Sequence, residues 1–185
     1  MTYAELHCKT NFTFLHGASH ADELADRALE LGYQGLAVTD RNSLSGVVRA
    51  HSAAKRCGLP LIIGAEIVLQ DAAPLVLWAP DRQAYGNLSR LITVGRRRAE
   101  KGECELYWND VAQYSNGLLA GVWPWTDFEL NQLRPTPTTD LRNVANCFRD
   151  RSFLLAPLHL GPDDADHISL FQGQTKQSGL RILAA

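Results

Sequence analysis

The sequence lacks the features that mark secreted, disulfide-stapled or membrane-spanning proteins. Its four cysteines are scattered and form no CxxC pair, so neither a disulfide framework nor a thiolate zinc site is expected. The first residues contain no basic segment followed by an apolar one, as a signal peptide would. The longest apolar stretch, residues 59–69, is interrupted by Pro60, Gly64 and Glu66 and is too short to cross a bilayer. These absences predict a cytoplasmic protein with no membrane partner.

An excess of positive charge is also missing. The 185 residues carry a net charge of -2, with 45% hydrophobic and 21% charged residues. These proportions are ordinary for a globular protein with a real core. A freestanding nucleic-acid-binding domain usually has a clear basic excess, so the chain as a whole does not fit that class. A local basic patch remains open.

Two glycine motifs that hold nucleotides are absent as well. No GxGxxG follows the first expected strand, and GxxxxGK[ST] occurs nowhere in the chain. What is present is an alternation of short apolar strands with amphipathic helices, which predicts a parallel sheet or barrel. Strands are expected at residues 3–8, 35–39, 59–69, 74–79, 117–122, 153–159 and 180–184. Helices are expected after the first, second, fourth and sixth of these strands and again shortly before the fifth and sixth, but not between residues 59–69 and 74–79, and residues 123–140 are expected to form an irregular loop.

The starts of the first two helices can be read from the sequence. Ser19 is the expected N-cap of the first helix, with Asp22 in its positive first turn. The second helix is expected to begin near Ser43. Its periodicity places Val48 and His51 on the apolar face, at or near the core.

Several residues able to bind metal fall at the carboxyl ends of the expected strands, where a barrel carries its chemistry. His7, Asp40 and His159 close strands, Glu66 lies within one, and His16 lies in the first loop. Imidazole and carboxylate together suit Zn²⁺, Mn²⁺ or Fe²⁺, which could activate water for phosphate-ester hydrolysis. The alternative for each histidine is a hydrogen-bonded structural role. Glu66 is harder to explain in this way, because a buried acid needs a cation or a metal.

A run of basic residues follows the fourth expected strand. It consists of Arg90, Arg96, Arg97, Arg98 and Lys101. A solvated helix C-terminus, which favours cations, is the first explanation of the run. The alternative is a contact to DNA phosphate or to an acidic surface of another domain.

Four segments together resemble one family. Residues 5–20 (ELHCKTNFTFLHGASH), 37–51 (AVTDRNSLSGVVRAH) and 64–66 (GAE) resemble the first three motifs of the PHP (polymerase and histidinol phosphatase) domain. The opening Leu-His-Cys and the segment 95–104 (GRRRAEKGEC) are similar to the error-prone branch of the bacterial C-family DNA polymerases.

This resemblance implies a fold, a context and partners. The fold is an α/β, distorted (β/α)7 TIM-like barrel that is incomplete at the C-terminus, with residues 1–185 as the N-terminal portion of a longer polymerase. The parent would carry out translesion synthesis after DNA damage, with Mg²⁺ at catalytic carboxylates in another domain. Its partners would be DNA, the remaining polymerase domains, the sliding clamp and accessory mutagenesis proteins.

The sequence departs from the family's metal ligands. Lys9 stands where the first motif has its second histidine, and Arg41 replaces the histidine of the second motif. The late Asp-x-His motif is absent. His7 and Glu66 match the family's ligands; the remaining candidates match it approximately, namely His16, His159 and Asp40. We therefore expect Lys9 and Arg41 to occupy metal positions and to form ion pairs with Glu66 and Asp40.

Three readings of function follow. The first is a scaffold within an error-prone polymerase, with no primer extension by this chain alone. The second is a metal-dependent phosphoesterase or 3′–5′ exonuclease of PHP type. The third is the product of a truncated gene. An exposed sheet edge would favour dimerisation or poor solubility unless it is covered.

Overall fold

A computed structural model describes residues 3–123, 136–157, 161 and 164–184. The strands are β1 (Glu5–Cys8), β2 (Leu36–Val38), β3 (Leu61–Ile67), β4 (Leu75–Ala79), β5 (Leu119–Val122), β6 (Ser152–Ala156) and β7 (Arg181–Ala184). The helices are α1 (Ala21–Glu30), α2 (Val47–Cys57), α3 (Arg82–Arg98), α4 (Trp108–Tyr114), α5 (Thr138–Phe148) and α6 (Asp164–Ser178), with a 3-10 turn at Arg149–Arg151.

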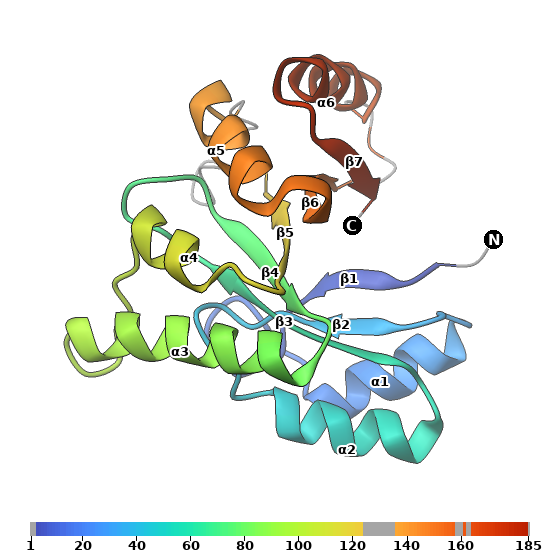
Figure 1. Cartoon of the computed structure of the whole chain (residues 1–185). Coiled ribbons are helices and arrows are strands. Elements are labelled where there is room, and N and C mark those ends of the chain that lie inside the picture. Colours follow the sequence, from blue (N-terminus) through green and yellow to red (C-terminus); the bar gives the residue numbers. More distant parts are fainter. Residues whose placement is uncertain (1–2, 124–135, 158–160, 162–163, 185) are drawn as a thin grey trace.

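The strands form a single curled sheet in the order β1-β2-β3-β4-β5-β6-β7, with the helices packed around its outer side (Figure 1). Within the described residues β1 and β7 are its two edges, so the barrel is incomplete, as predicted. The expectation of a fully parallel sheet is wrong at β4, which runs antiparallel to both β3 and β5. Residues 68–74 join β3 to β4 without a helix, so the chain turns straight back on itself.

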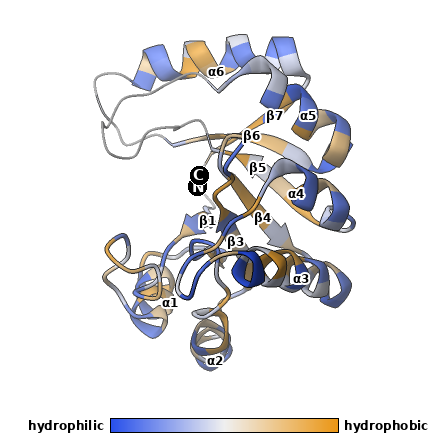
Figure 2. Ribbon diagram, turned by 90° about the vertical axis from the view of Figure 1, so that its left-hand side faces the viewer, coloured by the Kyte–Doolittle hydropathy of each residue, from blue (hydrophilic) through white to orange (hydrophobic). Residues whose placement is uncertain are grey.

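The two faces of the sheet bury different sets of apolar side chains. In β3, Ala65 and Ile67 pack outward with the larger core cluster beneath α3, α4 and α5. Ile62 belongs to a smaller cluster on the inner face, around Val76 and Trp78. The strands carry most of the hydrophobic colour, while the helices show both colours (Figure 2). Since side chains alternate along a strand, Glu66 lies on the inner face with Ile62.

Trp78 is part of the inner-face cluster. Its side chain is buried, and its indole Nε1 donates a hydrogen bond of 2.9 Å to the carbonyl of Leu6 on β1. A Cβ atom on Gly64 would lie 3.0 Å from the Trp78 ring and 2.6 Å from the carbonyl oxygen of Leu77. Gly64 therefore leaves room for the indole in the middle of a strand.

The predicted N-cap of the first helix is wrong by one residue. His20 is the N-cap of α1, and the Glu23 carboxylate accepts a hydrogen bond of 2.8 Å from the His20 backbone N–H. Glu23 thus satisfies a donor that the helix leaves open, as in a capping box. Asp22 lies in the first turn, as expected.

The second helix begins later than predicted, at Val47. Ser43 and Ser45 form a hydrogen-bonded turn instead, in which the Ser45 N–H donates to the Ser43 hydroxyl. The buried face of α2 consists of Val47 and three alanines, including Ala50, whereas Val48 is 74% exposed. The placement of His51 near the core is wrong, because this face turns it to solvent.

The other expected elements agree with the structure, apart from their ends. The expected strand 153–159 ends at Ala156, and most of the expected loop 123–140, namely 124–135, lies outside the described residues. Within the part of the chain that the structure describes, no helix combines the length and apolar character needed to cross a membrane. All four cysteines are free and partly buried.

Candidate functional site

A bulge in β1 shapes the site. Glu5 and Cys8 of β1 pair with Leu36 and Val38 of β2, so three steps along β1 match two along β2. The extra residue breaks the usual alternation of side chains. As a result His7 reaches the inner face, where its ring lies 4.4 Å from that of Trp123.

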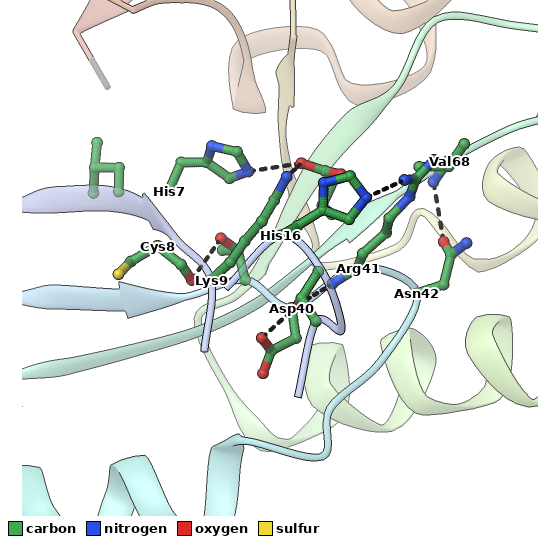
Figure 3. Close-up of polar contacts among 12 residues, drawn as sticks. His7, Cys8, Lys9, His16, Asp40, Arg41, Asn42 and Val68 are labelled. Atoms are coloured by element: carbon green, nitrogen blue, oxygen red, sulfur yellow. Dashed lines mark hydrogen bonds and ion pairs between the residues drawn. The ribbon is translucent and has the colours of Figure 1, made fainter. Parts of the chain in front are cut away.

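His7, Lys9 and Glu66 converge on this face. The Nε2 atom of His7 lies 2.9 Å from Oε2 of Glu66, and the Nζ atom of Lys9 lies 2.8 Å from the same oxygen. Figure 3 shows the His7 and Lys9 side chains directed toward this carboxylate. The side chains are only 8%, 11% and 5% exposed for His7, Lys9 and Glu66, so this is a buried charged cluster. The expected Lys9–Glu66 ion pair is present.

This arrangement decides the ionisation of Glu66. Burial raises the pKa of the Glu66 carboxyl, but the hydrogen bond from His7 and the charge of Lys9 outweigh it and bring the pKa to about 2. Glu66 is therefore a carboxylate at neutral pH. Since a carboxylate only accepts hydrogen bonds, Nε2 of His7 carries a hydrogen on that side.

The residues present do not fit a metal ion at this position. His7 and Glu66 are two ligand types that Zn²⁺ or Mn²⁺ would accept, but the third group on the same oxygen is an ammonium. A protonated lysine has no lone pair to offer, and its charge repels a cation. Among the described residues, no three His, Cys, Asp or Glu side chains are grouped so as to hold a metal.

Asp40 has a different environment from the one expected. Its buried carboxylate accepts hydrogen bonds from the Thr10 N–H at 2.8 Å, from the Thr10 hydroxyl at 2.9 Å and from the Thr13 hydroxyl at 2.7 Å. A Cβ atom on Gly46 would lie 2.8 Å from the Thr10 hydroxyl oxygen, so a glycine allows this close packing. Asp40 therefore fastens the loop between β1 and α1 to the end of β2.

The predicted ion pair between Arg41 and Asp40 is wrong. Arg41 Nη1 lies 3.3 Å from Nε2 of His16, and the two side chains lie side by side in Figure 3. Asp40 and Arg41 are neighbours in extended chain, so their side chains point to opposite sides. The Arg41 backbone N–H donates to the Thr13 hydroxyl, which ties its position to the same loop.

The basic run divides into two groups. The Arg96 guanidinium donates to the carbonyls of Gly102 and Asn42, and Arg98 forms a bidentate ion pair with Asp110 at 2.6 and 2.9 Å. These two arginines organise the chain that follows α3. The other three basic side chains are exposed and make no ion pair in the described part of the chain; they are Arg90, Arg97 and Lys101.

The sequence did not predict some features of the site, and one predicted residue cannot be placed. His159 falls outside the described residues. The threonines that hold Asp40 were not predicted, although their spacing, Thr10 and Thr13 directly after a strand, places two hydroxyls on one turn of loop. The contact between His7 and Trp123 depends on the curl of the sheet, and no local pattern indicates it.

Comparison with known proteins agrees with this fold. The PHP domain family matches residues 5–136. The error-prone DNA polymerase of Rhodopirellula baltica is 44% identical over 100% of this chain and 16% of its own length. The error-prone DNA polymerase of Dechloromonas aromatica is 45% identical over 98% of this chain and 17% of its own length. The chain thus spans 16–17% of the length of these relatives.

A solved structure shows the same fold. A Bifidobacterium adolescentis protein described as a metal-dependent phosphoesterase superposes with a TM-score of 0.70, over 100% of this chain and 86% of its own. The sequences are only 14% identical, so the likeness concerns the arrangement of strands and helices.

Proposed function

Because the chain belongs to the PHP domain family, we propose that it is the N-terminal PHP domain of a bacterial error-prone DNA polymerase. The identity of 44–45% to two such polymerases over nearly the whole chain supports this assignment. In that setting residues 1–185 form one structural domain, and the parent acts in translesion synthesis in the cytoplasm. DNA, the other polymerase domains, the sliding clamp and accessory mutagenesis proteins would be its partners.

Within that polymerase the domain acts as a scaffold in which an ion pair replaces a metal cluster. The observation that carries this proposal is the position of Lys9, whose Nζ atom lies 2.8 Å from the Glu66 oxygen that His7 also contacts. The ammonium neutralises the charge of a buried carboxylate, as a divalent cation would in a metal-binding PHP site. Lys9 thus preserves the shape of the site without its hydrolytic chemistry. Mg²⁺ would belong to the nucleotidyl-transfer site of the parent, outside this chain.

The metal content of the purified chain tests the proposal directly. After incubation with Zn²⁺ or Mn²⁺ and desalting, plasma mass spectrometry should find less than about a tenth of an equivalent, since two ligands beside an ammonium do not hold a metal. A Mn²⁺-dependent phosphatase assay should show no activity that depends on His7 or Glu66. One or more tightly held equivalents, with activity lost in both His7→Ala and Glu66→Ala, would instead establish a PHP-type phosphoesterase or exonuclease.

A further inference from the structure

A second feature lies beside the salt-bridged cluster and is chemically different from it. A cavity of about 450 Å³ opens between the β1–α1 loop, the end of β2, the end of β3 and the chain after α3. Its lining includes Phe14, His16, Arg41, Gln70, Arg96 and Glu103. Its volume falls in the range of about 300–1,000 Å³ that is common for small-molecule sites.

The walls of this cavity are tied together before any ligand arrives. Arg96 donates to the Asn42 carbonyl at 3.1 Å and to the Gly102 carbonyl at 2.8 Å, which joins the end of β2 to the chain after α3. The Asn42 side-chain oxygen accepts a hydrogen bond of 3.0 Å from the Val68 N–H, which joins the end of β3 to the same wall. A preformed cavity loses little conformational entropy on binding.

The charge of the cavity favours an anion. Arg41 and Arg96 both line it, and in the described chain neither lies within 4.0 Å of a carboxylate. The Arg96 guanidinium is held by carbonyl oxygens, which leave its positive charge in place. Against these two cations stands one lining carboxylate, that of Glu103. Guanidinium groups are the preferred partners of phosphate oxygens.

An aromatic ring stands at the rim of this cationic cavity. Phe14 is 81% exposed, on a turn closed by the His16 N–H donating to the Thr13 carbonyl at 3.0 Å. Within this turn Leu15 has a φ of 65°, an unusual conformation for a bulky residue. The neighbouring Phe12 ring already has a cationic partner, since the guanidinium carbon of Arg49 lies 5.8 Å from its centroid. Phe12 is 42% exposed, so Phe14 is the more exposed of the two aromatic rings that line the cavity.

We propose that this cavity binds a nucleotide unit, with its phosphate between Arg41 and Arg96 and its base stacked on Phe14. An exposed aromatic ring beside cations is the combination that binds unpaired bases, whereas a base inside a duplex has no free face. The unit could come from a free nucleotide or from a single strand, which present the same chemistry. Binding here requires no metal and no hydrolysis, so it is independent of the Lys9–Glu66 ion pair.

Fluorescence anisotropy with a labelled oligothymidylate and the full 185-residue chain tests the proposal, with unlabelled thymidine monophosphate, duplex DNA and inorganic phosphate as competitors. Phe14→Ala and Arg41→Met should each weaken binding about tenfold, which corresponds to about 1.4 kcal/mol. Glu103→Gln should strengthen it, because it removes the opposing charge. Circular dichroism melts should be unchanged for Phe14→Ala, whose side chain is almost fully exposed.

Two matched controls separate this site from diffuse attraction. Leu15→Ala removes an equally exposed apolar neighbour of Phe14, and Arg97→Met removes an exposed cation next to Arg96; both should change affinity less than about twofold. Thymidine monophosphate competing as well as the oligomer would identify a free nucleotide as the ligand, and a much tighter oligomer would identify a single strand. The proposal is overturned if neither the oligomer nor thymidine monophosphate binds, or if duplex DNA or inorganic phosphate competes equally. It is also overturned if Leu15→Ala weakens binding as much as Phe14→Ala, or Arg97→Met as much as Arg41→Met.

Discussion

Lys9 and His7 contact the same oxygen of Glu66, at 2.8 and 2.9 Å, on the inner face of a half-open barrel. The cluster is buried, so its charges are only weakly screened by solvent. Removal of one partner leaves the others in an apolar surrounding beside Trp123. The stability of this part of the fold therefore depends on all three groups together.

Lys9→Met should destabilise the chain by about 3 kcal/mol, because it leaves a buried carboxylate without its cation. The pKa of Glu66 should rise at the same time. Urea unfolding followed by circular dichroism measures the change. Arg27→Met is the matched control, since Arg27 and Glu30 form an ion pair with both side chains about two-thirds exposed, and its loss should cost less than about 1 kcal/mol. Equal effects of the two substitutions would contradict the role of burial.

Acid should remove the contribution of Glu66. Its pKa in the folded chain is about 2, below the ordinary value of 4.5, so the folded state binds the proton more weakly than the unfolded state. The resulting stabilisation, on the order of 3 kcal/mol, is fully present above pH 4.5 and is lost as the pH falls toward 2.

The free energy of unfolding of wild type and Glu66→Gln, measured at several pH values, tests this linkage. The gap between the two proteins should be largest near neutral pH and should shrink below pH 4.5. Glu30→Gln, at an exposed ion pair, serves as the control and should show only a small gap throughout. A gap for Glu66→Gln that stays constant down to pH 2 would show that the carboxylate charge contributes nothing.

The sequence was sufficient for the general position of this site. Carboxyl ends of parallel strands meet at one edge, so His7, Asp40 and Glu66 were expected near one another. The Lys9–Glu66 pair was foreseeable because a buried acid requires a cation. The assignment to the PHP domain family is confirmed, whereas the metal-replacing role of Lys9 stays a prediction.

Other features depend on geometry that a single chain segment does not encode. The bulge that turns His7 inward depends on how β1 pairs with β2. The partner of Arg41 depends on which side of an extended chain it occupies, and the charge pattern alone favoured Asp40 wrongly. Likewise, the reversed direction of β4 follows from a short connection, which strand–helix alternation obscured.

Lys9→His should give the chain a metal site that the wild type lacks. The substitution replaces an ammonium with an imidazole next to His7 and Glu66, which together supply three ligands of the kind that Zn²⁺ binds. Plasma mass spectrometry should find close to one equivalent after incubation with Zn²⁺ and desalting, and Co²⁺ should give a visible absorption band. Lys101→His, at an exposed lysine, should bind no more than the wild type. Equal metal content in both variants would mean that Lys9 does not stand at a metal position.

Thr13→Val should loosen the end of β2. The Thr13 hydroxyl donates to Asp40 at 2.7 Å and accepts from the Arg41 N–H at 3.1 Å, so a side chain of similar shape removes both bonds. Because one of them involves a buried carboxylate, the expected loss is about 2 kcal/mol, with faster hydrogen exchange at the Arg41 amide.

Thr93→Val separates this effect from the general cost of replacing threonine. The Thr93 hydroxyl is exposed and donates to the Ser89 carbonyl of its own helix, so its loss should cost less than about 0.5 kcal/mol and leave the Arg41 amide unchanged. If Thr13→Val also left that amide protected, Asp40 would hold the loop through Thr10 alone. The position of Arg41, on which the cationic cavity depends, would then be set by its contact with His16 rather than by the loop.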